Sequence, residues 1–274
     1  MGPSEVFVHP TSVVPSQAQL GEGVWVGPHC VIGDKVIIHK NTRLEGNIQI
    51  LGSTEIGESC LFSPFSVIGG EPQDVGYRQE ATRVLIGDRN VFREFNTVHR
   101  GTIKGGGETV IGNGGYFMAY SHIGHDCRVG NDVVFINAAT LGGHVSVDDY
   151  ATISAFSAVH QFCRIGKYAY IGGFTVVTLD VVPFAKVAGM RPVLFYGLNA
   201  IGLRRQGFTR DRIQVIKHIF KLLFYSDLNT SQAVERIQAQ IPAGEDRDEV
   251  IRFIQASKRG IIKKPSGTWD EESE

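Results

Sequence analysis

Six polar residues lie close together in the middle of the chain, and five of them have side chains that can move protons or bind a metal ion. They are His122, His125, Asp126, His144, His160 and Gln161. An imidazole titrates near pH 6.5, so a neutral histidine can act as a general base at physiological pH, and a neighbouring carboxylate can orient it. Histidine is also a frequent zinc ligand. Which chemistry applies depends on whether the fold brings these side chains together.

The elements that would position these residues follow from an apolar residue at every sixth position. The series runs from Val8 to Ile68, from Ile86 to Val98 and from Ile111 to Val177. Glycine often follows the apolar residue, and the residue four positions after it is small or β-branched. A helix would need a spacing of 3.6 and an ordinary strand a spacing of two, whereas a six-residue repeat is typical of a parallel β-helix. We therefore expect an all-β fold of three-stranded coils, each about 18 residues long.

The repeat is interrupted twice. In the first interruption the six-residue positions hold Asp74 and Glu80, whose carboxylates could be buried only at great cost, which predicts a loop at about 70–84. In the second, successive apolar positions are 13 residues apart, which predicts a shorter loop at about 99–110. Long loops on a rigid solenoid tend to carry function.

After the repeat fades, the spacing becomes helical. We therefore divide the chain into a β-helix over 1–196 and a small α-helical domain over 197–274. The spacing predicts one helix capped by Thr209, one capped by Thr230 and ended by Pro242, and one from about Asp246 to Gly260. The charged tail after Ile262 is expected to be frayed.

Composition narrows the class of protein. The 274 residues include 33 glycines and carry a formal net charge of −1, which argues against a nucleic-acid binder. No apolar run approaches the 18 residues of a membrane-spanning helix, and the N-terminus lacks a basic-then-apolar signal. The cysteines occupy inward positions of the repeat: Cys30, Cys60, Cys127 and Cys163. Because Cys127 and Cys163 would lie two coils apart, too far for a disulfide, we expect a reduced, intracellular protein.

An 18-residue coil also indicates which outward residues stack. Gly143 lies one coil after His125, Gln161 lies two coils after it, and His144 lies one coil after Asp126. The register therefore predicts a base, a carboxylate, a peptide N–H and further polar groups within about 10 Å. Glycine at 143 would let a reacting carbonyl group approach the main chain. Only a neighbouring subunit could cover such an outward site, so we expect an oligomer.

Three interpretations of this cluster stay open on the residues alone. The histidines could be ordinary surface residues of a β-helical assembly module without catalytic activity. They could bind zinc between subunits, as in a zinc-dependent hydratase, with His122, His125 or His160 as ligands. They could serve general-base acyl transfer.

Several sequence blocks resemble one enzyme family. They are SHIGHDC at Ser121–Cys127, LGGHVSVDD at Leu141–Asp149, AVHQFC at Ala158–Cys163, VHRGT at Val98–Thr102 and GLRRQGF at Gly202–Phe208. In these blocks the chain is similar to the acyl-carrier-protein-dependent UDP-N-acetylglucosamine O-acyltransferases of lipid A biosynthesis. The similarity extends from about Phe7 to Ile262.

The resemblance implies a homotrimer of left-handed parallel β-helices with active sites in clefts between subunits. The family transfers a (3-hydroxy)acyl chain from acyl carrier protein to the glucosamine 3-hydroxyl of UDP-N-acetylglucosamine. It needs neither a metal nor a dissociable cofactor, because the acyl carrier protein itself carries the 4′-phosphopantetheine. Bacterial members are cytoplasmic, whereas a plant member would lie in the mitochondrial matrix after removal of a transit peptide.

Carried over by residue, the resemblance makes His125 the general base, Asp126 its orienting carboxylate and the Gly143 N–H the oxyanion donor. The sugar, thioester or nucleotide pocket would be lined by Gln73, Asp74, His122, His144, His160 and Gln161. The uridine diphosphate would be held by Asn199 with Arg205 or Arg204, and acyl length would be set near Gly173. Basic residues of the helical domain would suit an acidic carrier protein: Arg204, Arg205, Arg210, Arg212, Lys217 and Lys221.

Two positions depart from the family pattern. Gly76 stands where the family usually has lysine, and Ile201 stands where it often has glutamate. The missing lysine leaves room for a related acceptor, such as a 3-amino sugar nucleotide that would give an amide.

Overall fold

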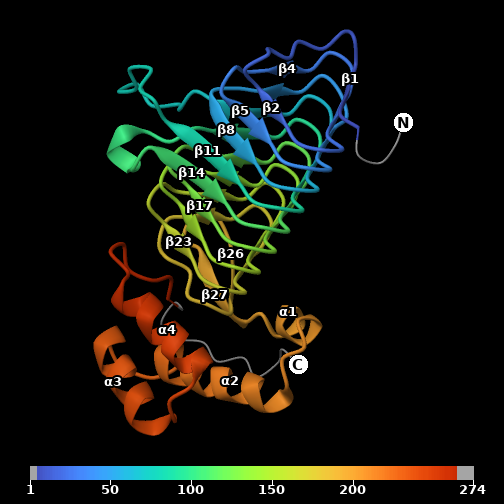
Figure 1. The fold of residues 1–274 in the computed structure, drawn as a ribbon. Helices are drawn as coiled ribbons and strands as arrows, with labels where there is room; N and C mark the ends of the chain where they lie inside the picture. Colours follow the sequence, from blue (N-terminus) through green and yellow to red (C-terminus); the bar gives the residue numbers. More distant parts are fainter. Residues whose placement is uncertain (1–4, 264–274) are drawn as a thin grey trace.

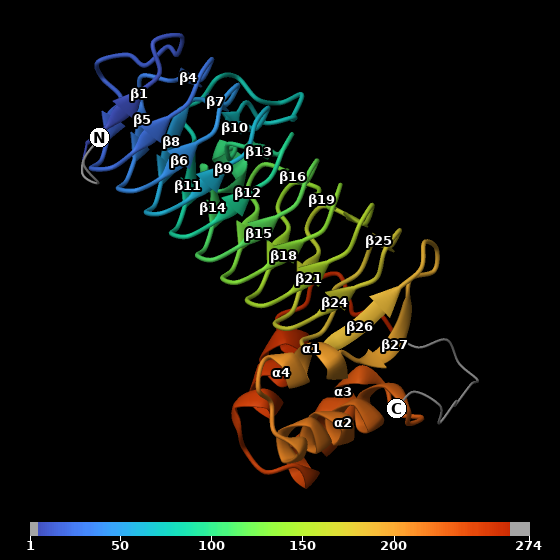
Figure 2. The ribbon, with the colours of Figure 1, turned by 90° about the vertical axis from the view of Figure 1, so that its right-hand side faces the viewer.

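The structure is a computed structural model that describes residues 5–263, so most of the tail expected to be frayed lies outside it. Short strands wind into a triangular prism whose three walls are parallel sheets, with helices gathered at one end (Figures 1 and 2). We call the walls sheets A, B and C, and the corners between them edges AB, BC and CA.

The strands of each wall are short and evenly spaced along the chain. Sheet A consists of β1 (Phe7–Val8), β3 (Trp25–Val26), β6 (Arg43–Leu44), β9 (Leu61–Phe62), β12 (Val91–Phe92), β15 (Tyr116–Phe117), β18 (Val134–Phe135), β21 (Thr152–Ile153), β24 (Tyr170–Ile171), β26 (Ala185–Ala188) and β27 (Leu194–Leu198). Sheet B consists of β4 (Val31–Ile32), β7 (Gln49–Ile50), β10 (Val67–Gly70), β13 (Thr97–His99), β16 (His122–Ile123), β19 (Thr140–Leu141), β22 (Ala158–Val159) and β25 (Val176–Val177). Sheet C consists of β2 (Gln19–Leu20), β5 (Val36–Ile38), β8 (Ser53–Ile56), β11 (Arg83–Ile86), β14 (Glu108–Ile111), β17 (Arg128–Val129), β20 (Ser146–Val147) and β23 (Arg164–Ile165).

The register between regular coils is the predicted eighteen residues. In sheet B, His122 pairs with Thr140, and Thr140 pairs with Ala158. In most of the two-residue strands the second residue points inward. Phe92 is one of these, and it stacks on Phe62 and Phe117 with ring centroids 4.8 and 4.5 Å apart. All four cysteines are buried and free, as their inward positions predicted, and burial raises the pKa of each thiol.

Each edge is turned by a residue in the left-handed region of φ. At edge BC these residues are Asp126, His144 and Phe162, with φ of 61°, 61° and 66°. At edge AB several of the left-handed residues are aromatic, and their exposed rings are described below: Phe65, Phe95, Tyr120, Phe156 and Phe174. Edge CA carries side-chain oxygens that accept backbone N–H groups of the preceding coil, from Asp88, Asn113, Asn131 and Asp149.

The chain leaves the coil twice, both times at edge BC. Residues 71–82 connect β10 to β11, and this segment contains Asp74 and Glu80, the carboxylates that could not be buried. Residues 100–107 connect β13 to β14 and include a short 3-10 turn, η1 (Ile103–Gly105). Both loops therefore lie on the edge that carries His125.

The C-terminal part begins with a hairpin that the six-residue pattern did not predict. Strand β26 continues sheet A in parallel with β24, and β27 returns antiparallel to it. Four helices follow: α1 (Ala200–Arg205), α2 (Arg210–Phe224), α3 (Thr230–Gln240) and α4 (Glu245–Gln255). Figure 2 shows them at the end of the prism opposite the first coil.

The helices correct three details of the prediction. Thr209 caps α2 as expected, but α3 is capped by Asn229, which forms a reciprocal capping box with Gln232, and not by Thr230. Helix α4 ends at Gln255, five residues before Gly260. The sequence pattern missed α1, which is too short to show a helical period.

Candidate active site

His125 and Asp126 form a buried pair at edge BC. The Nδ1 of His125 lies 2.7 Å from Oδ2 of Asp126, and the two side chains are 13% and 0% exposed. A carboxylate oxygen can only accept, so the proton of this hydrogen bond sits on Nδ1. In the neutral imidazole the lone pair is then on Nε2, which can take a proton from a ligand.

Asp126 is held from several sides. Its Oδ1 accepts the backbone N–H of Thr102 and its Oδ2 accepts the Thr102 hydroxyl, each at 2.7 Å. Its own N–H donates to Oγ1 of Thr109 at 2.8 Å. These contacts fix the carboxylate, and through it the His125 ring.

His144 stands beside the pair, one coil further on. Its ring meets the His125 ring edge-on with centroids 5.1 Å apart, and its Nε2 is 3.6 Å from Oδ2 of Asp126. Its other face stacks on Phe162 at 4.4 Å. Burial lowers the pKa of His144, so the ring is neutral at physiological pH. Phe162 therefore supports this histidine within its own chain.

Gly143 lies directly against the His125 ring. A Cβ at this position would sit 2.5 Å from Cε1 and 2.6 Å from Nε2 of that ring, so a larger residue would have to displace the imidazole. The Gly143 N–H donates to no residue that the structure describes. A base and a free peptide donor thus lie side by side, as the 18-residue register predicted.

Two further histidines extend the cluster toward the N-terminus. Nδ1 of His122 lies 2.8 Å from Oγ1 of Thr97, and the His122 ring meets the His99 ring edge-on at 4.9 Å. Burial, followed by the charges of neighbouring histidines, lowers the pKa of His99 to about 4, and burial also lowers that of His122. Sequence reasoning did not select His99, although it lies in the VHRGT block. Two signals could have indicated His99: the charged Arg100 follows it directly, and it lies at the end of β13, where the chain leaves sheet B.

Other predicted residues lie near this cluster but do not join its hydrogen bonds. His160 and Gln161 are exposed at edge BC, and Nδ1 of His160 lies 3.1 Å from the Gln161 carbonyl oxygen. Gln73 is exposed on the 71–82 loop, where Oδ1 of Asp74 accepts the Gly76 N–H. The Asp74 charge reaches far enough to raise the pKa of His144 slightly against the effect of burial.

The remaining predicted residues lie on other edges of the same chain. Gly173 is exposed at edge AB, between β24 and β25. Asn199 caps α1, accepting the Gly202 N–H, and its amide donates to the Tyr168 carbonyl oxygen at edge CA. Arg204 and Arg205 are exposed on α1. One chain therefore does not bring this second group to His125.

Comparison with known proteins identifies the family. The family model "Udp N-acetylglucosamine O-acyltransferase; Domain 2" matches residues 180–262. A Thermodesulfovibrio yellowstonii protein named acyl-[acyl-carrier-protein]–UDP-N-acetylglucosamine O-acyltransferase is 45% identical over 93% of this chain and 99% of its own length. The chain belongs to this O-acyltransferase family.

Solved structures of O-acyltransferases in the family have the same fold. The Francisella novicida UDP-N-acetylglucosamine acyltransferase superposes with a TM-score of 0.92 at 36% identity over 95% of each chain. The Arabidopsis UDP-N-acetylglucosamine acyltransferase gives 0.82 at 33% identity, over 94% of this chain and 100% of that one. These likenesses confirm the predicted fold class, a left-handed parallel β-helix with a small C-terminal helical part. Among residues 5–263, no helix of this O-acyltransferase combines the length and apolarity that crossing a bilayer requires.

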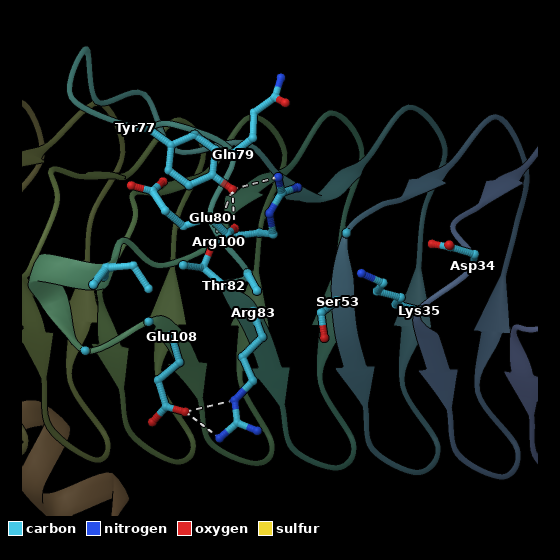
Figure 3. A pocket seen from close by; sticks show the side chains of 15 residues that line it. Asp34, Lys35, Ser53, Tyr77, Gln79, Glu80, Thr82, Arg83, Arg100 and Glu108 are labelled. Atoms are coloured by element: carbon cyan, nitrogen blue, oxygen red, sulfur yellow. Dashed lines mark hydrogen bonds and ion pairs between the residues drawn. The ribbon is translucent and has the colours of Figure 1, made fainter.

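A hollow of about 880 Å³ lies on the N-terminal side of both loops of the O-acyltransferase (Figure 3). Arg100 closes one side of it by donating to the Gly69 carbonyl oxygen and to the Tyr77 hydroxyl, which pins the 71–82 loop. Arg83 and Glu108 form an ion pair across sheet C below. None of the residues predicted for the site lines this hollow.

The structure also bears on the zinc alternative. One set of potential ligands stands out in the described part of the chain: nitrogens of His125 and His144 and an oxygen of Asp126, all within 4.8 Å of one another. His122 and His160, expected as ligands in that alternative, are not in this set. Because Asp126 already accepts hydrogen bonds from Thr102 and His125, its carboxylate is arranged to orient a base.

Proposed function

We propose that this protein transfers an acyl chain, the (3-hydroxy)acyl chain of the family, from acyl carrier protein to the glucosamine 3-hydroxyl of UDP-N-acetylglucosamine, the first step of lipid A biosynthesis. The observation that carries the mechanism is the His125 imidazole, held by Asp126 on one side and lying against the free Gly143 N–H on the other. Membership of the O-acyltransferase family supports the substrates.

The reaction follows from these groups. Nε2 of His125 takes the proton of the sugar 3-hydroxyl as its oxygen attacks the thioester carbonyl carbon. The carbonyl oxygen becomes an oxyanion, which the Gly143 N–H stabilises. When the tetrahedral intermediate collapses, the carbon–sulfur bond breaks, and the phosphopantetheine sulfur leaves with the proton that His125 returns. The products are the acylated sugar nucleotide and free carrier thiol, and the base is regenerated.

The magnitudes match what such groups supply. A positioned general base contributes about 10²–10⁴-fold to the rate, and one oxyanion donor about 3 kcal/mol of transition-state stabilisation. The carrier protein brings its own phosphopantetheine, so the proposed steps need no resident cofactor. His144, neutral because of its burial, adds a polar group beside the pair without adding charge.

Substrate binding needs a second copy of the chain. Gln73, Asp74, His122, His144, His160 and Gln161 would line the sugar and thioester side of the site, all from edge BC or its loops. Gly173 for the acyl chain, and Asn199, Arg204 and Arg205 for the diphosphate, would come from neighbouring protomers, since they lie elsewhere on one chain. We therefore propose a homotrimer with clefts between subunits.

Edge AB supports this assembly. Its exposed aromatics stack along the edge: Phe65 on Phe95, Phe95 on Tyr120, and Phe156 on Phe174. Phe174 is 65% exposed in the single chain, and an apolar column of this kind is typical of an interface. Native mass spectrometry should give three chains per particle, and a monomer at micromolar concentration would contradict the proposal.

One experiment tests donor, acceptor and bond type together. The protein is incubated with UDP-N-acetylglucosamine and a panel of acyl carrier thioesters, and the product is analysed by mass spectrometry. We expect one ester-linked acyl group, cleaved by mild alkali. A 3-amino sugar nucleotide consumed in preference, with an alkali-stable product, would favour the amide alternative that Gly76 suggested.

The role of His125 is tested separately. His125→Ala should lower turnover at least about a hundredfold and leave the trimer intact, because it removes the base and little packing. Near-normal activity in that variant would contradict the assignment. Metal analysis of the purified protein addresses the hydratase alternative, which requires stoichiometric zinc. We place the reaction in the bacterial cytoplasm, as the curated relatives are bacterial.

A further inference from the structure

The 100–107 loop has no part in the reaction as proposed above, yet it touches the catalytic pair. It leaves sheet B after β13, makes the short turn η1 and rejoins sheet C at β14. Its only deeply buried side chain is that of Thr102, which is 4% exposed. This buried hydroxyl donates a hydrogen bond to the carboxylate of Asp126, which suggests that the loop positions that carboxylate.

Thr102 engages both oxygens of Asp126. The backbone N–H reaches Oδ1 and the hydroxyl reaches Oδ2, both at 2.7 Å. Oδ2 is also the atom that accepts the His125 Nδ1–H at 2.7 Å. The hydroxyl of Thr102 and the imidazole of His125 thus share one acceptor atom, and both donate to it because a carboxylate oxygen can only accept.

The same hydroxyl ties the carboxylate to the turn itself. While it donates to Asp126, the Thr102 oxygen accepts the Gly105 N–H at 3.2 Å and so caps η1. This places Gly105 against the carboxylate. A Cβ at Gly105 would overlap the carboxylate carbon and both oxygens of Asp126, although its backbone conformation is open to any residue. Glycine is needed at 105 for space and not for its φ.

We propose that the 100–107 loop is a support for the catalytic carboxylate, with Thr102 and Gly105 as positioning residues for the acyl-transfer reaction. Neither residue touches the substrates. Thr102 holds Asp126 in the orientation that keeps the proton on Nδ1 of His125, and Gly105 leaves the room in which the carboxylate lies. The inference rests on the proposed function for its kinetic consequence, but not for the hydrogen-bond chain itself.

The first test is the pair Thr102→Val and Thr102→Ser in the full-length protein. Valine keeps the shape and the backbone donor and removes the hydroxyl, so kcat should fall about tenfold while KM for the sugar nucleotide stays within about twofold. Serine restores the hydroxyl and should restore kcat to within about twofold of the unchanged protein. A valine variant with unchanged kcat, or a serine variant as slow as the valine one, overturns the proposal.

The second test leaves Thr102 in place. Gly105→Ala should lower kcat about a hundredfold, because the new methyl group displaces a carboxylate that accepts three hydrogen bonds. Gly33→Ala is the matched control at another corner of edge BC, where the nearest atom to a new Cβ is 3.4 Å away. Equal activity of the two alanine variants contradicts the role of Gly105. This arm stays informative even where the valine variant does not fold.

A spectroscopic readout separates this inference from the proposed function. The Nδ1–H of His125 bonded to Asp126 should give a downfield proton signal in the free protein, present in Thr102→Ser and shifted or lost in Thr102→Val and Gly105→Ala. If the unchanged protein shows the signal but transfers no acyl chain, the proposed function fails while the support stands. If acyl transfer occurs and the signal is unchanged in all three variants, the support fails.

Discussion

Edges BC and CA of the prism have the same backbone turn but differ in their polar groups, which are paired with one another at edge CA and left partly unpaired at edge BC. At edge CA, side-chain oxygens of Asp88, Asn113, Asn131 and Asp149 each accept a backbone N–H from the coil before, at 2.7–2.9 Å. At edge BC, His125 and His144 converge on one carboxylate oxygen. The Gly143 N–H and the far nitrogen of His125 have no hydrogen-bond partner among residues 5–263.

The difference shows how a repetitive scaffold separates stability from chemistry. A ladder in which each polar group is satisfied stabilises the stack, since an unpaired buried donor costs about 1–3 kcal/mol. An active site needs the reverse, a donor and an acceptor held in place and left for the substrate. The chain achieves both stability and an open site with the same backbone turn, because the residue before the left-handed position is Asn131 at edge CA and His125 at edge BC.

The largest effect should come from removing the space at edge BC. Gly143→Ala puts a methyl group 2.5 Å from the His125 ring, so the imidazole must swing away from the peptide donor. We expect kcat to fall about a hundredfold with little change in thermal midpoint, because the atoms nearest to the new methyl group all belong to the His125 ring and none to the backbone. Steady-state kinetics and differential scanning fluorimetry measure the two quantities. A loss of stability without a loss of kcat would mean that this corner is structural too.

At edge CA we expect a smaller effect, which lowers stability and not kcat. Oδ1 of Asn131 accepts both the backbone and side-chain N–H of Asn113, and its amide donates to Asp149. Asn131→Ala leaves the Asn113 N–H without its acceptor, which should lower the free energy of unfolding by about 2 kcal/mol and leave kcat unchanged. Denaturant titration with activity per folded chain checks both. Reduced kcat in the folded variant would show that the edges are not independent.

The smallest effect concerns a carboxylate beside the ladder. Burial raises the pKa of Asp148 to about 6, an effect to which Glu249 on α4 and Asp149 also contribute, while Arg164 and Lys167 oppose it. The folded pKa exceeds the unfolded value near 3.8, so ionisation destabilises the fold, and stability falls as the pH rises from about 4 to 6.

Asp148→Asn should therefore stabilise the protein by about 1 kcal/mol at pH 8 and have no effect at pH 4, since partial exposure screens the charge. Thermal midpoints of both proteins across this pH range provide the measurement. A gain of equal size at pH 4 would point to a cause other than ionisation. The variant should not alter kcat, because Asp148 lies on the ladder edge.

The regular coils were predictable because their register is arithmetic. Counting eighteen from His125 gives Gly143, and the structure has these two groups in contact. The same count from His144 gives Phe162, and these two rings stack in the structure. For residues in the loops outside the regular coils, counting eighteen no longer identifies the spatial neighbour. Thr102 reaches Asp126 through a turn whose path depends on a cap and three glycines, and no period encodes it.

The C-terminal part was harder to predict for a related reason. Thr209 precedes a long amphipathic helix, and its role as a cap could be recognised. Asn229 and Thr230 are both good caps, and only the reciprocal bond with Gln232 selects the first. The hairpin β26–β27 extends sheet A, but its two strands pair antiparallel to each other, so their residues do not follow the six-residue spacing.

The stacking of whole coils limits how this chain can change in length. Neighbouring strands lie about 4.8 Å apart, so the separation between His125 and helix α1 along the prism can take only stepped values, one step for each eighteen residues. A shorter insertion would turn every later side chain onto a different wall unless the extra residues were expelled sideways, as they are at 71–82. The number of complete coils therefore fixes the distance between His125 and helix α1.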